Sequence, residues 1–204
     1  MYVRYERQAR LVDQRRLERA KAAVMGMGGL GNFVAMELAL AGVGHIYVVD
    51  RDRVEETNLN RQFLFRDEDI GRPKAEVAAE RLREINPKVR ITPVRGDAKH
   101  LDLDVDLIFD CLDVWEEKQA LWKKEIPVVF GSIGGWIGMV GIFIEKHPKF
   151  VARPATDVLG ASAGIVGSLM AQEGIKELSG QKSPLRNKIL HIDLRRLEFT
   201  VLEL

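Results

Sequence analysis

The amino-acid sequence predicts an α/β fold, a Rossmann-like mixed sheet with a parallel N-terminal part, antiparallel C-terminal strands and helices on both faces. Over the first two thirds of the chain, short apolar or β-branched runs alternate with helical stretches, which is typical of parallel strands covered by helices. A glycine-rich turn follows the first of these runs, as in a βαβ unit. Two runs near the C-terminus, at 188–193 and 198–202, have the pattern of an antiparallel pair.

Composition indicates an ordinary globular protein. A length of 204 residues suits one domain, so we expect residues 1–204 to form a single domain. A net charge of +1 gives no reason to expect nucleic acid or membrane as a partner. The apolar run 137–144 is too short to span a bilayer, and the charged N-terminus has no secretion signal. The single cysteine, Cys111, excludes an internal disulfide framework and favours a cytoplasmic location.

The first βαβ unit begins with the apolar run 22–25, which predicts a buried strand. After the glycine turn, the Ala- and Leu-rich stretch 33–40 predicts a helix, and a β-branched strand at 46–49 ends at Asp50. The later elements follow from the same patterns, with Asn86-Pro87 as the stop of the second helix. They are a helix at 72–85, strands at 89–94 and 105–111, a helix at 115–124, strands at 126–130 and 137–145, and a helix at 160–178. A glycine-rich turn containing Gly131, Gly134 and Gly135 is expected before the strand at 137–145.

The glycine turn predicts a nucleotide site. Gly26, Gly28 and Gly31 satisfy G-x-G-x-x-G, in which glycine lets the backbone approach phosphate at a helix N-terminus. Asp50 ends the next strand, 19 positions after Gly31, where a carboxylate can accept hydrogen bonds from ribose. The alternative is a tight turn followed by an exposed aspartate. The loop alone does not separate NAD(P) from ATP.

The polar segment after Asp50 favours ATP. Arg61 and Lys74 could both bind a triphosphate, and Asp113, just beyond a strand, could hold Mg²⁺ through oxygen. Each has a simpler explanation: an isolated Arg or Lys is usually a solvated surface charge, and Asp113 could be the N-cap of the helix that follows. The combination carries the inference.

Five motifs along the chain resemble those of the ThiF/MoeB/HesA family, the prokaryotic relatives of ubiquitin-activating enzymes. They are R-Y-E-R-Q at 4–8, G-M-G-G-L-G at 26–31, D-R-D-R-V-E-E-T-N-L-N-R-Q at 50–62, G-R-P-K at 71–74 and D-C-L-D at 110–113. The resemblance implies an adenylyltransferase that uses ATP and Mg²⁺ to activate the C-terminal Gly-Gly carboxylate of a small ubiquitin-like protein. It also implies a homodimer in which Arg7 reaches into the neighbouring site.

The resemblance also implies the residues of the site. The nucleotide-binding residues would be Gly26, Gly28, Gly29, Gly31, Asp50, Asp52, Thr57, Asn58, Arg61, Gln62, Lys74, Leu112 and Asp113. The catalytic residues would be Arg7, Arg61, Lys74 and Asp113, with Asp113 as the Mg²⁺ ligand.

The sequence departs from the family at its cysteines. It has neither of the two Cys-x-x-C pairs that bind zinc in many members, so we expect no zinc. The crossover cysteine that forms a thioester or persulfide is also absent, and its place falls near Arg153. Cys111 is expected to pack as a small buried hydrophobe. Val114 interrupts the family's D-N-x-x-x-R.

Three functions remain open on the sequence. The first is adenylation of a sulfur carrier for molybdenum or tungsten cofactor, thiamine or tRNA thiolation. The second is an NAD(P)-binding oxidoreductase, against which the segment 58–62 and Lys74 argue. The third is a non-catalytic nucleotide-binding relative, against which the retained Arg7, Arg61, Lys74 and Asp113 argue.

Overall fold

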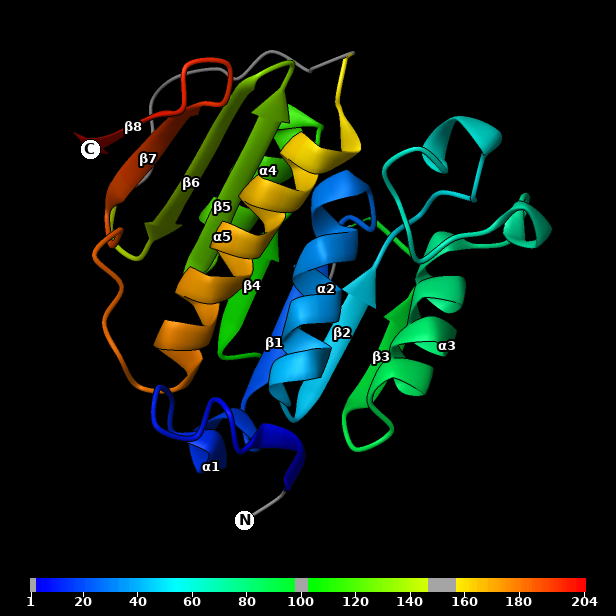
Figure 1. Ribbon diagram of the computed structural model, residues 1–204, viewed down its shortest axis with the longest axis horizontal. Coiled ribbons are helices and arrows are strands. Elements are labelled where there is room, and N and C mark those ends of the chain that lie inside the picture. The colour runs from blue at the N-terminus through cyan, green and yellow to red at the C-terminus, as the bar shows by residue number, and fades with distance from the viewer. Residues whose placement is uncertain (1–2, 98–102, 147–156) are drawn as a thin grey trace.

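The computed structural model describes residues 3–97, 103–146 and 157–204, which form one eight-stranded sheet (Figure 1). The strand order is β3-β2-β1-β4-β5-β6-β7-β8. The parallel strands are β1 (Lys21–Met25), β2 (His45–Val49), β3 (Arg90–Val94), β4 (Leu107–Asp110) and β5 (Val128–Gly134). The antiparallel strands are β6 (Ile137–Phe143), β7 (Lys188–Asp193) and β8 (Glu198–Glu203). The predicted mixed sheet is therefore confirmed.

Helices cover both faces of this sheet, as predicted. Figure 1 shows α3 (Lys74–Ile85), α2 (Gly29–Ala41) and α5 (Gly160–Leu178) in front of the strands, and α4 (Trp115–Trp122) behind them. A short helix, α1 (Gln14–Leu17), lies near the N-terminus. Within the described part of the chain, no helix combines the length and apolarity needed to cross a bilayer.

The topology creates a crevice at the carboxyl ends of β1 and β4. From β1 the chain moves outward to β2 and β3, whereas β4 and β5 extend the sheet in the other direction. Connections that leave a pair of neighbouring strands in opposite directions open a crevice between them, and ligands of open α/β sheets bind there. The glycine turn lies at this place, because it joins β1 to α2.

Small residues allow α5 to pack closely on α2 and on the sheet. A Cβ on Gly167 would lie 2.8 Å from the Cβ of Phe33, and one on Gly164 would lie 3.1 Å from the Phe33 ring. A Cβ on Gly174 would lie 2.2 Å from the ring of Phe109 on β4. The small residues of α5 therefore serve packing.

The structure corrects the predicted glycine turn. Gly131 and Gly134 lie within β5, and the turn to β6 falls at Gly135, whose φ is 57°. Gly131 is required inside the strand because the Met170 sulfur occupies the space of its missing side chain, 2.1 Å from an ideal Cβ. This requirement comes from α5, about 40 residues further along the chain, so local sequence could not reveal it.

Candidate nucleotide-binding site

A cavity of about 340 Å³ opens at the carboxyl edge of the sheet, beside the glycine turn. Most of the residues predicted for the nucleotide line it: Gly26, Gly28, Gly29, Asp50, Asp52, Asn58, Arg61, Gln62, Lys74, Leu112 and Asp113. Gly31, Thr57 and Arg7 are not among the lining residues. Groups that lie up to 87 positions apart in the chain, from Gly26 to Asp113, thus meet in one cavity.

The glycine turn presents bare backbone to this cavity. An ideal Cβ on Gly28 would meet nothing within 4 Å, and Gly28 is the N-cap of α2 without a side-chain cap. The first N–H groups of α2 are therefore uncapped by a side chain, and such groups bind anions. Gly31 has another role, because a Cβ there would lie 1.9 Å from the Gly26 oxygen. Its lack of a side chain lets α2 start directly against the turn.

Asp50 lies at the end of β2 and is held against the same turn. Its carboxylate accepts hydrogen bonds of 2.7 Å from the backbone N–H groups of Met27 and Asp52. Burial raises the pKa of Asp50 above its usual value, while these two N–H groups act in the opposite direction. The carboxylate is thus oriented beside the glycine turn, as a ribose-binding group would be.

Two cations face the cavity with different degrees of restraint. The Arg61 guanidinium donates to the backbone oxygen of Thr57 at 2.8 Å and to Asn60 Oδ1 at 2.9 Å, which fixes its direction. Thr57 therefore contacts Arg61 through its backbone oxygen. Lys74 is 8% exposed, and its Nζ lies 3.9 Å from Asp52 Oδ2, beyond hydrogen-bonding distance. A buried ammonium group is unfavourable without a close partner, and the Asp52 carboxylate is too distant to hydrogen-bond to it. An anionic ligand bound beside Lys74 would supply that partner.

Gln62 offers a further polar atom at the cavity. The side chain is 2% exposed and lines the cavity, and its Oε1 has no hydrogen-bond partner among the described residues. Buried polar atoms are rarely left unpaired, so a bound molecule is one explanation for this one.

The two aspartates of the D-C-L-D motif have different environments. Asp110 is fully buried and accepts from Lys118 Nζ at 3.0 Å and from Trp122 Nε1 at 2.9 Å. Asp113 is exposed and lines the cavity, and no hydrogen bond or ion pair of its carboxylate is found within the described ranges. Val114, not Asp113, is the N-cap of α4. The capping explanation for Asp113 is therefore wrong, and its carboxylate is open to a cation.

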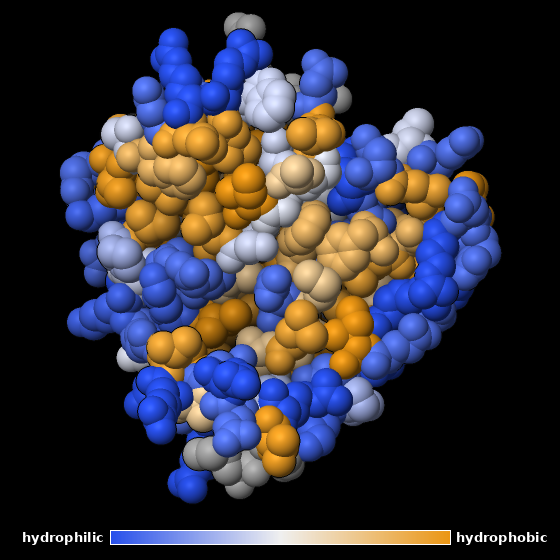
Figure 2. Space-filling model, viewed as in Figure 1, coloured by the Kyte–Doolittle hydropathy of each residue, from blue (hydrophilic) through white to orange (hydrophobic). Residues whose placement is uncertain are grey.

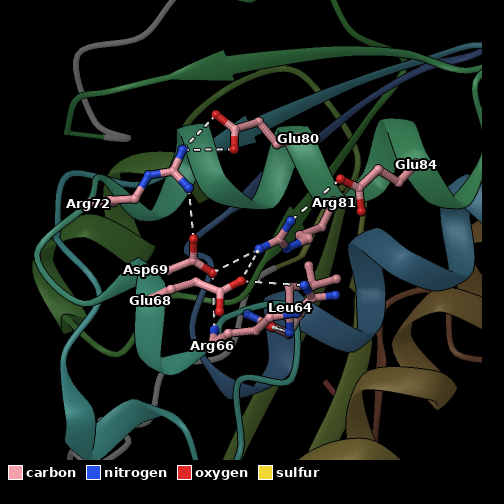
Figure 3. A network of polar contacts seen from close by, with 9 residues as sticks. Leu64, Arg66, Glu68, Asp69, Arg72, Glu80, Arg81 and Glu84 are labelled. Carbon is pink, nitrogen blue, oxygen red and sulfur yellow. Dashed lines mark hydrogen bonds and ion pairs between the residues drawn. The ribbon is translucent and has the colours of Figure 1, made fainter.

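A network of charged side chains holds the segment that carries Asn58, Arg61 and Gln62 (Figure 3). Asp69 is fully buried and pairs with Arg72 at 2.7 Å and with Arg81 of α3 at 3.3 Å. Further carboxylates of Glu68, Glu80 and Glu84 surround the two arginines. The polar segment is thereby fastened to α3, the helix that Lys74 begins.

Sequence reasoning missed Asn32, which joins the glycine turn to this same segment. Its amide donates to the backbone oxygens of Met27 at 2.8 Å and Gly28 at 3.0 Å, and its Oδ1 accepts from Leu64 N. Asn32 directly follows the last glycine of the motif. A polar amide at this place in a largely apolar helix was the signal that could have revealed its role. The cavity-lining side chains of Arg51, Glu117 and Lys118 were missed as well.

Cys111 packs as the sequence predicted. The side chain is buried in the apolar core, and burial, together with the charge of Asp110, raises the pKa of its thiol far above the usual range. A thiol that stays protonated is a poor nucleophile. Residues 147–156, which include Arg153 at the place of the family's crossover cysteine, lie outside the described residues.

Comparisons with known proteins agree on the family. A model of the ThiF family matches residues 5–204. The chain is 37% identical over 229 residues to a sulfur carrier protein adenylyltransferase of Thermus thermophilus, and this match covers 96% of this chain and 84% of that protein. It is 32% identical over 213 residues to a molybdopterin-synthase adenylyltransferase of Escherichia coli, with 94% and 86% covered. A solved structure of E. coli MccB with succinimide matches with a TM-score of 0.87 over 98% of this chain and 70% of that chain. At 22% identity, that match supports the fold alone.

The fold, the cavity and the relatives define a Rossmann-like adenylyltransferase. The chain belongs to the ThiF family, as its motifs predicted.

Proposed function

We propose that this protein uses ATP to adenylate the C-terminal Gly-Gly carboxylate of a small ubiquitin-like sulfur carrier, in a molybdopterin or tungstopterin, thiamine or tRNA-thiolation type of pathway. The observation that carries the proposal is the meeting of Gly29, Arg61, Lys74 and Asp113 around one cavity. Relatives named as sulfur carrier and molybdopterin-synthase adenylyltransferases support the acceptor class. Residues 1–204 would form one adenylation domain, and the protein would act in the cytoplasm.

The chemistry requires charge and positioning more than a protein nucleophile. An oxygen of the acceptor carboxylate attacks the α-phosphorus of ATP, the bond to the bridging oxygen breaks, and pyrophosphate leaves. Because two anions must approach each other, positive groups around the phosphates lower the barrier. The uncapped N-terminus of α2, Arg61 and Lys74 would bind the phosphates, and Asp50 would hold the ribose.

Asp113 would hold Mg²⁺ in this site. Its exposed carboxylate has no competing partner among the described residues, and oxygen is the donor that Mg²⁺ prefers. Bound there, the ion would neutralise charge on the phosphates and on the departing pyrophosphate.

We assign only the adenylation step to this sequence. A later thioester or persulfide step needs a reactive thiolate, and the single cysteine, Cys111, is buried with a raised pKa. The adenylated carrier would therefore pass to the sulfur of another protein.

The position of Arg7 supports a homodimer. Its neighbours are anchored at the far ends of the helices: Gln8 donates to the Ala41 oxygen at the end of α2, and Tyr5 accepts from Asn86 beyond α3. The cavity lies at the other end of α2, about 20 Å away for 13 residues. Arg7 is thus too far from the cavity of its own chain, which favours a role in the partner's site.

An exposed apolar surface supports the same proposal. Leu40 of α2 is 45% exposed, Ile165 of α5 is 43% exposed and Phe63 is 41% exposed. Figure 2 shows apolar surface in the region where α2 and α5 lie in Figure 1. We assign this face to a second copy of the chain, because the second copy would bring the Arg7 that each site lacks.

Exchange of labelled pyrophosphate into ATP tests the function. With purified sulfur carriers ending in Gly-Gly, the wild-type protein should catalyse exchange, and Asp113→Ala should lower the rate at least about 100-fold, the size of effect typical for loss of a charge-stabilising group. Asp67→Ala, which removes an exposed aspartate outside the cavity, is the matched control and should keep the wild-type rate. If Asp113→Ala exchanges pyrophosphate at the wild-type rate, Asp113 has no role in the site.

Tight binding of NAD(H) or NADP(H) without binding of ATP would support an oxidoreductase instead.

A further inference from the structure

An ion pair between Arg51 and Glu117 forms part of the cavity wall, and Glu117 lies outside the motifs that carry the family resemblance. Arg51 follows β2, whereas Glu117 lies in the first turn of α4, and Arg51 Nη1 is 2.5 Å from Glu117 Oε1. Both side chains line the cavity. The pair joins the segment after β2 to α4, the helix that follows β4, and β2 and β4 lie on either side of β1 in the sheet.

The cavity has two chemically different ends. Gly28, Gly29 and Lys74 lie at the N-termini of α2 and α3, on the front face of the sheet in Figure 1. At the other end, the lining residue Val49 belongs to the apolar cluster beside α4, on the opposite face, and the lining residues Leu112 and Trp115 pack against that cluster. A nucleotide with phosphates at Gly28 and Gly29 and ribose at Asp50 would place its base at this second end, against apolar walls.

The carboxylate of Glu117 is held firmly at that second end. Its side chain is 8% exposed, whereas the Arg51 side chain is 50% exposed and also lies 3.8 Å from Asp97 Oδ2. Burying a carboxylate is costly unless it is paired, and Arg51 supplies the pairing charge. A carboxylate has about four acceptor positions, so it can accept from more than one donor at once.

We propose that Glu117, held by Arg51, accepts a hydrogen bond from the 6-amino group of adenine and thereby selects ATP over nucleotides without that amino group. Adenine carries a donor at C6, whereas hypoxanthine carries an acceptor oxygen there that would face the carboxylate. The inference rests on the proposed function, because it requires a nucleotide in this cavity. It adds Glu117 as a residue that determines which base of the nucleotide this protein accepts.

Binding of three nucleoside triphosphates tests the inference. Calorimetry with ATP, inosine triphosphate and purine riboside triphosphate, which has only hydrogen at C6, should show about 10- to 100-fold tighter binding of ATP by the wild-type protein. Glu117→Ala should reduce this ratio to near one. Arg51→Ala should reduce it partially, because Glu117 loses its restraint, and circular dichroism checks that this variant is folded. Glu116→Ala, an exposed neighbour outside the cavity, is the control and should keep the wild-type ratio.

The outcomes separate this inference from the proposed function. If Glu117→Ala and Arg51→Ala weaken all three nucleotides equally and the ratio stays at its wild-type value, the pair is structural and the inference is wrong. Wild-type binding of ATP without discrimination at C6, or a preference for GTP, would overturn the inference and leave adenylation intact. Failure of the wild-type protein to bind any nucleoside triphosphate would overturn both.

Discussion

At the residue scale, Asn32 shows how one side chain can hold two parts of a site together. It is fully buried and satisfies two carbonyl groups of the glycine turn and one N–H of the polar segment. Asparagine suits this place because one amide carries both donors and an acceptor. The distance between the anion-binding turn and the segment with Arg61 therefore depends on this side chain.

Replacement of Asn32 should weaken both folding and nucleotide binding. Asn32→Ala leaves the Met27 oxygen and the Leu64 N–H without their buried partner, which should lower the free energy of unfolding by about 2–3 kcal/mol. Urea denaturation measures the loss, and calorimetry should show a weaker affinity for ATP. Glu37→Gln, a half-buried change on the same helix, should alter neither quantity. A stable Asn32→Ala protein with normal ATP affinity would contradict this role.

The sequence predicted the site residues whose chemistry is recognisable at their own position. Glycines at a strand-to-helix turn, and Lys, Arg and Asp at strand or helix ends, carry a signal without their partners. Glu117 and Lys118 were not predicted, because charged residues in a short helix usually face solvent and their partners are distant in sequence. Glu117 pairs with Arg51, 66 positions away, and only the strand order brings them together.

At the element scale, the segment between β2 and α3 lacks a sheet or a long helix to hold it. It contains two short turns of 3-10 helix, Glu56–Asn58 and Asp67–Asp69, which the sequence did not predict because each spans three residues. Its order comes from side chains: Asp69 bonds to Arg72 and Arg81, and Asn58 caps the first turn. Strands and long helices were predicted well because their periodicity extends over many residues.

Removal of the Asp69 charge should therefore loosen this segment. Asp69→Asn leaves Arg81 of α3 without its buried counter-charge, and the free energy of unfolding should fall by about 3 kcal/mol. Urea denaturation measures this change, and the Michaelis constant for ATP should rise because Arg61 and Gln62 lie on the same segment. Glu84→Gln removes an exposed partner of the same arginine and should cost less than about 0.5 kcal/mol. Equal effects of the two variants would show that the buried network does not hold the segment.

At the scale of the whole molecule, the strand order explains the position of the cavity and its distance from the segment that carries Arg7. The reversal of strand order at β1 and β4 brings the glycine turn, Asp50 and Asp113 to one edge. The same topology sends Arg7 to the opposite edge, with Gln8 anchored at the end of α2. Sequence pattern alone could not place Arg7, because the anchoring contacts of its neighbours reach residues 33 and 81 positions away.

Mixing two inactive variants tests whether Arg7 completes the partner's site. Arg7→Ala and Asp113→Ala homodimers should each lose pyrophosphate exchange, since every site in them lacks one group. In a mixed dimer, the Arg7→Ala subunit keeps Asp113 and receives Arg7 from its partner, so one of its two sites is complete. Random exchange of subunits makes half of the dimers mixed, and the mixture should recover about a quarter of the wild-type rate. Arg10→Ala, an exposed change in the same segment, should be active alone. If the mixture is no more active than its two components, after subunit exchange has been verified by mass spectrometry, each site uses groups of one chain only and Arg7 has no role in the partner's cavity.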